Sequence, residues 1–171
     1  MKMEIDRSKL WTGFMSWAQI VLYKEQIIDM ELDEMIQFHY PDRKIPRSYP
    51  EQKVTELEQH LANGNTYFWG AIYDGKLLGY RWSFTSMFID KLRWNSRSCM
   101  FLPEARGLGL GTMSIEAEIE KAMEIGCDEV ATMYVPQNQH IAHINEKFGF
   151  QVTRIEAVRK LNRAPERQDE V

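Results

Sequence analysis

Two runs of apolar and aromatic residues lie next to each other near the middle of the chain. Residues 66–84, TYFWGAIYDGKLLGYRWSF, contain both runs, and Asp74 and Gly75 separate them. Both central positions of a type I′ turn need positive φ, so Asp-Gly between two such runs is a strong hairpin signal. We therefore expect two antiparallel strands joined at Asp74 and Gly75.

Three segments outside the hairpin are predicted to be helices, one before it and two after it: residues 50–62, 112–125 and 138–149. Pro50 suits the first turn of the first helix. Apolar residues recur at helical spacing in the other two, Asn138 is a helix-capping residue, and Gly126 and Gly149 follow as stops. The ends of these helices are thus fixed by local sequence.

The remaining segments have weaker patterns. Strands are expected at residues 96–102, 129–135 and 150–161. Residues 17–28 are partly β-branched and aromatic, a composition that permits a further strand. A short helix beginning at an acidic cap is expected over 29–38, followed by a proline-containing loop over 39–50. Polar residues 1–9 and 163–171 are expected to be tails. Together these elements predict one α+β domain over residues 1–171, with helices on the faces of a mixed sheet.

Composition narrows the function classes. The chain has 171 residues, about one domain, and a net charge of −4 without the basic excess of a nucleic-acid-binding protein. The apolar stretch at residues 10–23 is too short to span a membrane and has no signal-peptide cleavage site. Cys99 and Cys127 fit no zinc or redox spacing. We therefore expect a cytoplasmic protein with no nucleic-acid partner, no membrane partner and no metal.

A glycine loop joins the strand at 96–102 to the helix at 112–125. Gly107, Gly109 and Gly111 leave the backbone open, so several N–H groups can face one anion at the start of a helix. The sequence lacks the Lys of a P-loop after Gly111, and GxGxG is not the Rossmann spacing. A phosphate cradle and a simple tight turn both fit this motif alone.

Two motifs together resemble the GNAT family of N-acetyltransferases. PEARGLGLG is similar to the family's Q/R-x-x-G-x-G/A loop, and NQHIAHINEKFGF resembles its later helix that begins at Asn and ends in Gly-Phe. The order of predicted elements over Thr66–Leu161 is also the family's. The resemblance implies a mostly antiparallel sheet with helices on both faces and a splayed parallel strand pair that forms a cleft for acyl-CoA.

The resemblance also implies where acetyl-CoA, or another acyl-CoA, would lie as co-substrate. The pyrophosphate would contact the loop, and the strand before the loop would offer a backbone N–H to the thioester carbonyl. The implied cofactor-binding residues are Phe101, Leu102, Arg106, Gly107, Leu108, Gly109, Leu110, Gly111, Thr112 and Asn138. The implied reaction is direct attack of an amine on the thioester in a ternary complex, with a small molecule or peptide as acceptor.

The catalytic acid and base are less defined. Many family members have a Tyr acid five residues before the Phe of the Gly-Phe pair, whereas this chain has Asn145 there. An amide cannot give up a proton at neutral pH, so Tyr134 is the substitute candidate. The carboxylates considered as general base are Asp90, Glu104 and Glu129.

Several alternatives stay open at this stage. Cys99 as a nucleophile and His140 with His143 as a base or metal pair are the less favoured interpretations. The aromatic side chains of the hairpin fit core packing better than an acceptor pocket: Phe68, Trp69, Tyr80, Trp82 and Phe84. Asn145 also motivates an alternative function, a non-catalytic acyl-CoA sensor. Transfer of a longer acyl chain and a homodimer through the C-terminal strand are open as well.

Overall fold

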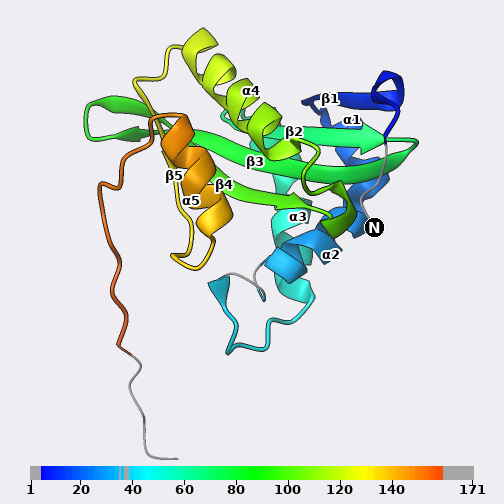
Figure 1. The fold of residues 1–171 in the computed structure, drawn as a ribbon, viewed down its shortest axis with the longest axis horizontal. Coiled ribbons are helices and arrows are strands. Elements are labelled where there is room, and N and C mark those ends of the chain that lie inside the picture. The colour runs from blue at the N-terminus through cyan, green and yellow to red at the C-terminus, as the bar shows by residue number, and fades with distance from the viewer. Residues whose placement is uncertain (1–4, 35, 37–38, 160–171) are drawn as a thin grey trace, which may run out of the picture.

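A computed structural model of the protein describes residues 5–34, 36 and 39–159. Within them, five strands form one sheet in the order β1-β2-β3-β4-β5 (Figure 1). Their bounds are β1 Leu10–Phe14, β2 Thr66–Tyr73, β3 Lys76–Phe88, β4 Lys91–Phe101 and β5 Glu129–Thr132. The first four strands are antiparallel, and β5 runs parallel to β4. The predicted mostly antiparallel mixed sheet is confirmed.

Two tight turns connect the central strands. Asp74 and Gly75 have φ of 49° and 77°, which confirms the predicted type I′ hairpin between β2 and β3. The next turn has Ile89 at φ 60°, a conformation that a β-branched residue adopts only when the surrounding structure imposes it. Because Ile89 is no turn signal, the sequence placed the start of β4 at Ser96, later than its actual start at Lys91.

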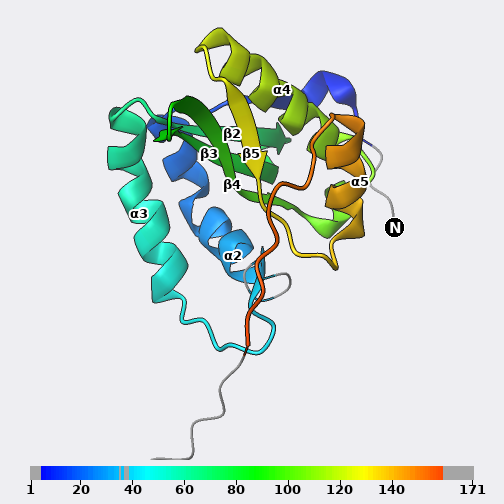
Figure 2. The same cartoon turned by 90° about the vertical axis from the view of Figure 1, so that its left-hand side faces the viewer.

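Helices cover both faces of the sheet. Figure 2 shows α2 (Lys24–Glu34) and α3 (Ser48–Ala62) on one side and α4 (Leu110–Glu124) on the other. The last helix, α5 (Gln139–Lys147), lies beside the first turn of α4, where Ile144 approaches Gly111. The three predicted helices are present within two residues of their expected starts. In the described part of the chain, no helix is long and apolar enough to cross a membrane.

Two apolar cores lie on the two faces. The larger core, under α2 and α3, contains Phe68, Tyr80 and Trp82, and the smaller, under α4, contains Trp69. These four aromatic side chains are at most 2% exposed, and the Phe68 and Tyr80 rings stack with centroids 5.1 Å apart. Core packing of the hairpin aromatics is therefore confirmed, with Phe84 partly buried.

The prediction that residues 17–28 permit a strand is wrong. The chain forms α1 (Trp17–Ile20), a 3-10 turn over Val21–Tyr23 and then α2, so Asp29 lies inside a helix and does not cap one. Ile20, Ile27 and Ile28 are at most 1% exposed and pack on the sheet. Packing of these isoleucines on the sheet thus overrides their β propensity.

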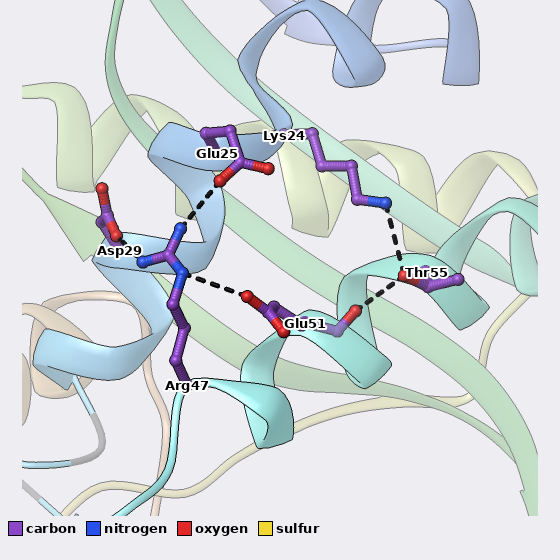
Figure 3. Close-up of polar contacts among 6 residues, drawn as sticks. All are labelled: Lys24, Glu25, Asp29, Arg47, Glu51 and Thr55. Carbon is purple, nitrogen blue, oxygen red and sulfur yellow. Dashed lines mark hydrogen bonds and ion pairs between the residues drawn. The ribbon is translucent and has the colours of Figure 1, made fainter.

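Polar contacts fix α2 against α3. The Arg47 guanidinium donates to Glu25 at 2.8 Å, to Glu51 at 3.1 Å and also to Asp29 (Figure 3). Lys24 Nζ lies 3.3 Å from the hydroxyl of Thr55 on α3. These contacts are exposed, so they orient the helix more than they stabilise the fold.

The predicted C-terminal strand is also wrong over its described part. Residues 150–159 contain no strand, and Val152, Ile155 and Val158 are 71%, 88% and 80% exposed. The apolar pattern gives strand propensity, but a strand also needs a hydrogen-bonded neighbour. Residues 160–161 and the tail from 163 lie outside the described residues. The homodimer through this segment stays a prediction.

Candidate active site

The parallel strands β4 and β5 separate in the middle of β4. Their pairing ends at Ser96 and Thr132, and the chain then leaves the sheet, so β5 stops before the predicted Val135. Ser83 pairs with Ser96 and Trp82 with Ser98, so Arg97 is a β-bulge at the same point. A bulge bends its strand and increases the local twist, which accounts for the divergence.

A cavity of about 60 Å³ lies where the strands diverge. It is lined by residues from α2, the α2–α3 connection, β3, β4, β5, the β5–α5 connection and α5: Glu34, His39, Arg81, Ser96, Arg97, Ser98, Cys99, Thr132, Met133, Tyr134, Val135, Asn138 and Ile141. Tyr134 and Asn138, both predicted from sequence, are therefore brought together here. The two side chains are partly buried.

The C-terminal half of β4 has an open edge towards this cavity. Leu102 N–H donates to Leu78 O at 2.9 Å, so this N–H belongs to the sheet. Successive N–H groups of a strand point to opposite sides, so those of Phe101 and Cys99 point away from β3. Cys99 N–H indeed donates to the carboxylate of Glu34 at 3.3 Å. Of the two residues expected to offer an N–H, the geometry thus favours Phe101 over Leu102.

The glycine loop follows the open edge directly. Gly107 and Gly109 have φ of 81° and 82°, and Gly109 is the residue that caps α4. A Cβ on Gly109 would meet no atom within 4 Å, so the loop surface is open. The N–H groups of Leu110, Gly111 and Thr112 are in the first helical turn and have no intrahelical acceptor. The loop can therefore bind an anion at the positive end of α4.

The side chains around the loop have different environments. Leu110 is 2% exposed and anchors the start of α4, Leu108 is partly buried, and Arg106 is exposed at the rim. Asn138 Oδ1 accepts from Ile141 N at 3.3 Å, which confirms it as the cap of α5. Arg106 is thus an exposed cation at the loop, whereas Asn138 fixes the start of α5.

Asn145 has a buried and unsatisfied donor. The residue is 4% exposed, and its Nδ2 has no hydrogen-bond partner within the described structure. Leaving a buried donor unpaired costs about 1–3 kcal/mol. A ligand with an acceptor group at this position would remove that cost.

The carboxylate at the cavity is one that the sequence did not single out. Glu34, the last residue of α2, lines the cavity, whereas none of the predicted carboxylates does so. Glu104 instead pairs with Lys76 at 2.6 Å and Glu129 with Arg93 at 2.5 Å, while Asp90 is in the β3–β4 turn. A sequence signal for Glu34 exists: it lies seven residues after Ile27, on the buried face of the helix.

Cys99 and the histidines of α5 do not form a catalytic group. Burial raises the pKa of the Cys99 thiol to about 11, so the thiol stays protonated and is a poor nucleophile. His140 and His143 are exposed on α5. Within the described ranges, no three His, Cys, Asp or Glu side chains are grouped to hold a metal ion.

A charged network lies under the cleft on the α4 face. Arg81 Nη1 is 3.1 Å from Glu118, and the two side chains are 5% and 3% exposed. Arg81 also donates to Ser114 at 2.9 Å and to Ser96 at 2.8 Å, and Trp94 Nε1 donates to Glu118 at 2.9 Å. This network joins α4 to β3 and β4 just where β5 departs.

The fold places the glycine-capped start of α4 next to the open edge of β4. Residues 29–150 match the Acetyltransferase (GNAT) family. Because the match covers more than half of the chain, the protein belongs to the GNAT family of acetyltransferases.

Comparisons with individual proteins found one relative in sequence and several proteins that share the fold. The Bacillus subtilis (strain 168) protein described as an uncharacterized N-acetyltransferase, YdgE, is 27% identical over 120 residues, 65% of this chain and 74% of that protein. A transcriptional regulator from Bacillus halodurans C-125 superposes with a TM-score of 0.71 at 16% identity, covering 89% of this chain and 99% of that one.

A third comparison includes bound ligands. The aminoglycoside N-acetyltransferase AAC(6′)-Iy was solved with CoA and with a CoA-S-monomethyl-acetylneamine bisubstrate analogue. The latter structure has a TM-score of 0.65 at 18% identity, covering 90% of this chain and 99% of that one. At these identities, the structural matches show that the fold is shared.

The Phe101 ring rests directly on Gly79 of β3. A Cβ at position 79 would lie 2.0 Å from Phe101 Cδ1 and 2.8 Å from Met100 O. We expect Gly79→Ala to displace the ring and lower the free energy of unfolding by about 1–3 kcal/mol, the usual effect of overpacking. Urea unfolding measures this change. Gly111→Ala is the control, because its Cβ would approach the same ring only to 3.9 Å; equal stability losses in both variants would contradict the prediction.

Proposed function

We propose that the protein transfers an acetyl or other acyl group from acyl-CoA to an amine of a small molecule or peptide. The observation that carries this proposal is the continuity of the open β4 edge with the glycine loop at the start of α4. Such a surface offers hydrogen bonds to an extended amide-containing chain and then to a pyrophosphate. Family membership supports the same assignment.

The pyrophosphate is assigned to the N–H groups of residues 107–112, with Arg106 adding a positive charge at the rim. The open space around Gly109 lets phosphate oxygens approach the backbone. Leu108 and Leu110 hold the loop through their side chains, and Leu110 is buried. This arrangement needs no metal ion.

The thioester is assigned to the Phe101 N–H, which would also stabilise the oxyanion of the tetrahedral intermediate. Both substrates are held together, so orientation supplies part of the acceleration and no covalent enzyme intermediate is formed. Tyr134 lines the cavity and is the candidate acid for the departing thiolate. Asn145, with its unpaired buried Nδ2, is assigned a hydrogen bond to the co-substrate.

The acceptor is proposed to be a small-molecule or peptide amine. The aminoglycoside acetyltransferase that shares the fold supports the small-molecule class without defining the compound. The second candidate function is an acyl-CoA sensor without turnover, favoured by an amide at position 145 in place of the Tyr found in many family members.

Thermal unfolding with acetyl-CoA and longer acyl-CoAs, followed by detection of free CoA thiol with a panel of amines, tests the proposal. We expect acyl-CoA to raise the Tm and at least one amine class to release CoA. Stabilisation without CoA release from any amine favours the sensor, whereas no stabilisation by any acyl-CoA contradicts both functions.

A further inference from the structure

Two buried carboxylates lie one helical turn apart near the end of α2. Glu31 is fully buried, receives a hydrogen bond from Tyr80 OH at 2.7 Å and forms an ion pair with Lys53 Nζ. Its charge is therefore paired with fixed partners in the core. Glu34 has a different environment, although it lies on the same face of the helix.

Glu34 is also buried, but in the described structure no Lys or Arg side chain forms an ion pair with it. The basic side chain at ion-pair distance is a histidine. Glu34 Oε1 accepts from Cys99 N–H at 3.3 Å, and His39 Nε2 lies 3.9 Å from the same oxygen. Lys53, whose charge acts on Glu34, contacts Glu31 instead. The Glu34 side chain is 11% exposed and lines the cavity between the splayed strands. Its carboxylate is therefore open to a molecule that enters this cavity.

The position of Glu34 along β4 fits the reaction. Cys99 and Phe101 are two residues apart on one strand edge, so their N–H groups are about 7 Å apart at the usual rise. A thioester carbonyl on Phe101 N–H and the Glu34 carboxylate near Cys99 N–H would leave space between them for one nitrogen. An amine there would be within reach of both groups.

We propose that Glu34 is the general base of the acetyl transfer, a role that rests on the proposed function above. Its carboxylate takes one proton from the acceptor ammonium, and the freed lone pair forms the C–N bond with the thioester carbon. The C–S bond then breaks, Tyr134 protonates the thiolate, and the second nitrogen proton restores the Tyr134 phenol, giving amide and CoA thiol. The proton on Glu34 returns to solvent, and His39, which is partly exposed, lies on that path.

The electrostatics of the surrounding groups agree with this role. Burial, reinforced by the charge of Glu31, raises the pKa of Glu34 to about 7, against the lowering effects of the Cys99 N–H, Ser98 and Lys53. Such a base is partly ionised at neutral pH and still basic.

Other titratable groups lie around Glu34. Burial raises the pKa of the Tyr80 phenol and of the Cys99 thiol, so both stay protonated. Burial lowers the pKa of His39, with Lys53 adding to the effect, which favours the neutral imidazole. Arg81 and Arg97 line the same cavity. Glu34 is thus the group that titrates near neutrality.

Glu34→Gln tests the proposal, because the amide keeps an oxygen for Cys99 N–H but cannot accept the proton. We expect kcat/KM to fall about 100- to 10,000-fold and the rise of the rate through pH 7 to disappear. The stabilisation by acetyl-CoA should be unchanged. Asp33→Asn, an exposed carboxylate on the same helix, is the control and should keep the wild-type rate and pH profile.

The same variant should be more stable than the wild type at alkaline pH. The raised pKa of Glu34 means that the folded state favours its protonated form, so the wild type loses stability as pH rises from about 4.5 through about 7. Glu34→Gln should lack this loss, giving a higher Tm above pH 7 and a similar Tm near pH 4. A purely structural carboxylate could show this Tm pattern but would leave the rate profile unchanged.

Different results would overturn different claims. Glu34→Gln with a rate within about threefold of the wild type, or with an unchanged pH profile, overturns the base assignment. A wild type that acetyl-CoA stabilises but that acetylates no amine also removes the catalytic role of Glu34, while the CoA site stands. A wild type that no acyl-CoA stabilises overturns the proposed function itself.

Discussion

The Gly109→Glu variant is expected to lose the stabilisation that acetyl-CoA gives to the wild-type protein. Gly109 caps α4 at φ 82°, so its replacement strains the loop and places a carboxylate where the proposed pyrophosphate lies. At 100 times its dissociation constant, acetyl-CoA should stabilise the wild type by about 2.7 kcal/mol. For a chain of this size, that corresponds to a Tm increase of about 5–10 °C. Thermal unfolding with and without acetyl-CoA measures it.

Gly126→Glu is the matched control at the other end of the same helix. Gly126 has φ 79° and, like Gly109, open space around its Cα, so the backbone strain is similar. This variant should have a lower Tm than the wild type but keep the full increase with acetyl-CoA. If both variants respond to acetyl-CoA as the wild type does, the glycine loop is a turn and not the pyrophosphate site.

The Arg81→Met variant is expected to lose about 3–5 kcal/mol of unfolding free energy, because removing one partner leaves the other charge buried alone. Glu118 is 2% exposed, and its remaining partners are neutral donors such as Trp94 Nε1. The loss is a large part of the roughly 5–15 kcal/mol typical of a domain. Urea unfolding at neutral pH measures it.

The double variant Arg81→Met/Glu118→Gln distinguishes the stability lost through the unpaired charge of Glu118 from the stability lost through the packing of Arg81. The glutamine amide that replaces the Glu118 carboxylate would still accept from Trp94 Nε1 without a buried charge, so the double variant should be more stable than Arg81→Met. Lys76→Met breaks an exposed ion pair and should change stability little, since Lys76 is 55% exposed. A double variant as unstable as Arg81→Met would show that lost packing, not the lone charge, causes the destabilisation.

Local signals explain which elements were predictable from sequence. The turn at Asp74 and Gly75, the stop at Gly126 and the cap at Asn138 depend on the conformations of a few adjacent residues. The glycine loop was predictable for the same reason, since positive φ at Gly107 and Gly109 is a local property. The family resemblance then connected these motifs into one fold.

Other features depend on partners distant in sequence. The isoleucines of α1 and α2 have strand propensity, but the sheet that they cover selects a helix. Residues 150–159 have the composition of a strand, yet pair with none in the described structure. In both cases the outcome depends on tertiary neighbours, which local propensity does not contain.

The sequence by itself determined the strand hairpin and the loop-to-helix motif, because each is encoded by neighbouring residues, and the resemblance of its motifs to a family implied the acyltransferase fold. Only the tertiary structure decided that β4 and β5 separate after Ser96 and that Glu34 reaches the open edge at Cys99. Glu34 and Cys99 are 65 residues apart in the chain, so no local pattern could bring them together. Burial, the physical cause of the raised pKa of Glu34, exists only once α2 has packed on the sheet.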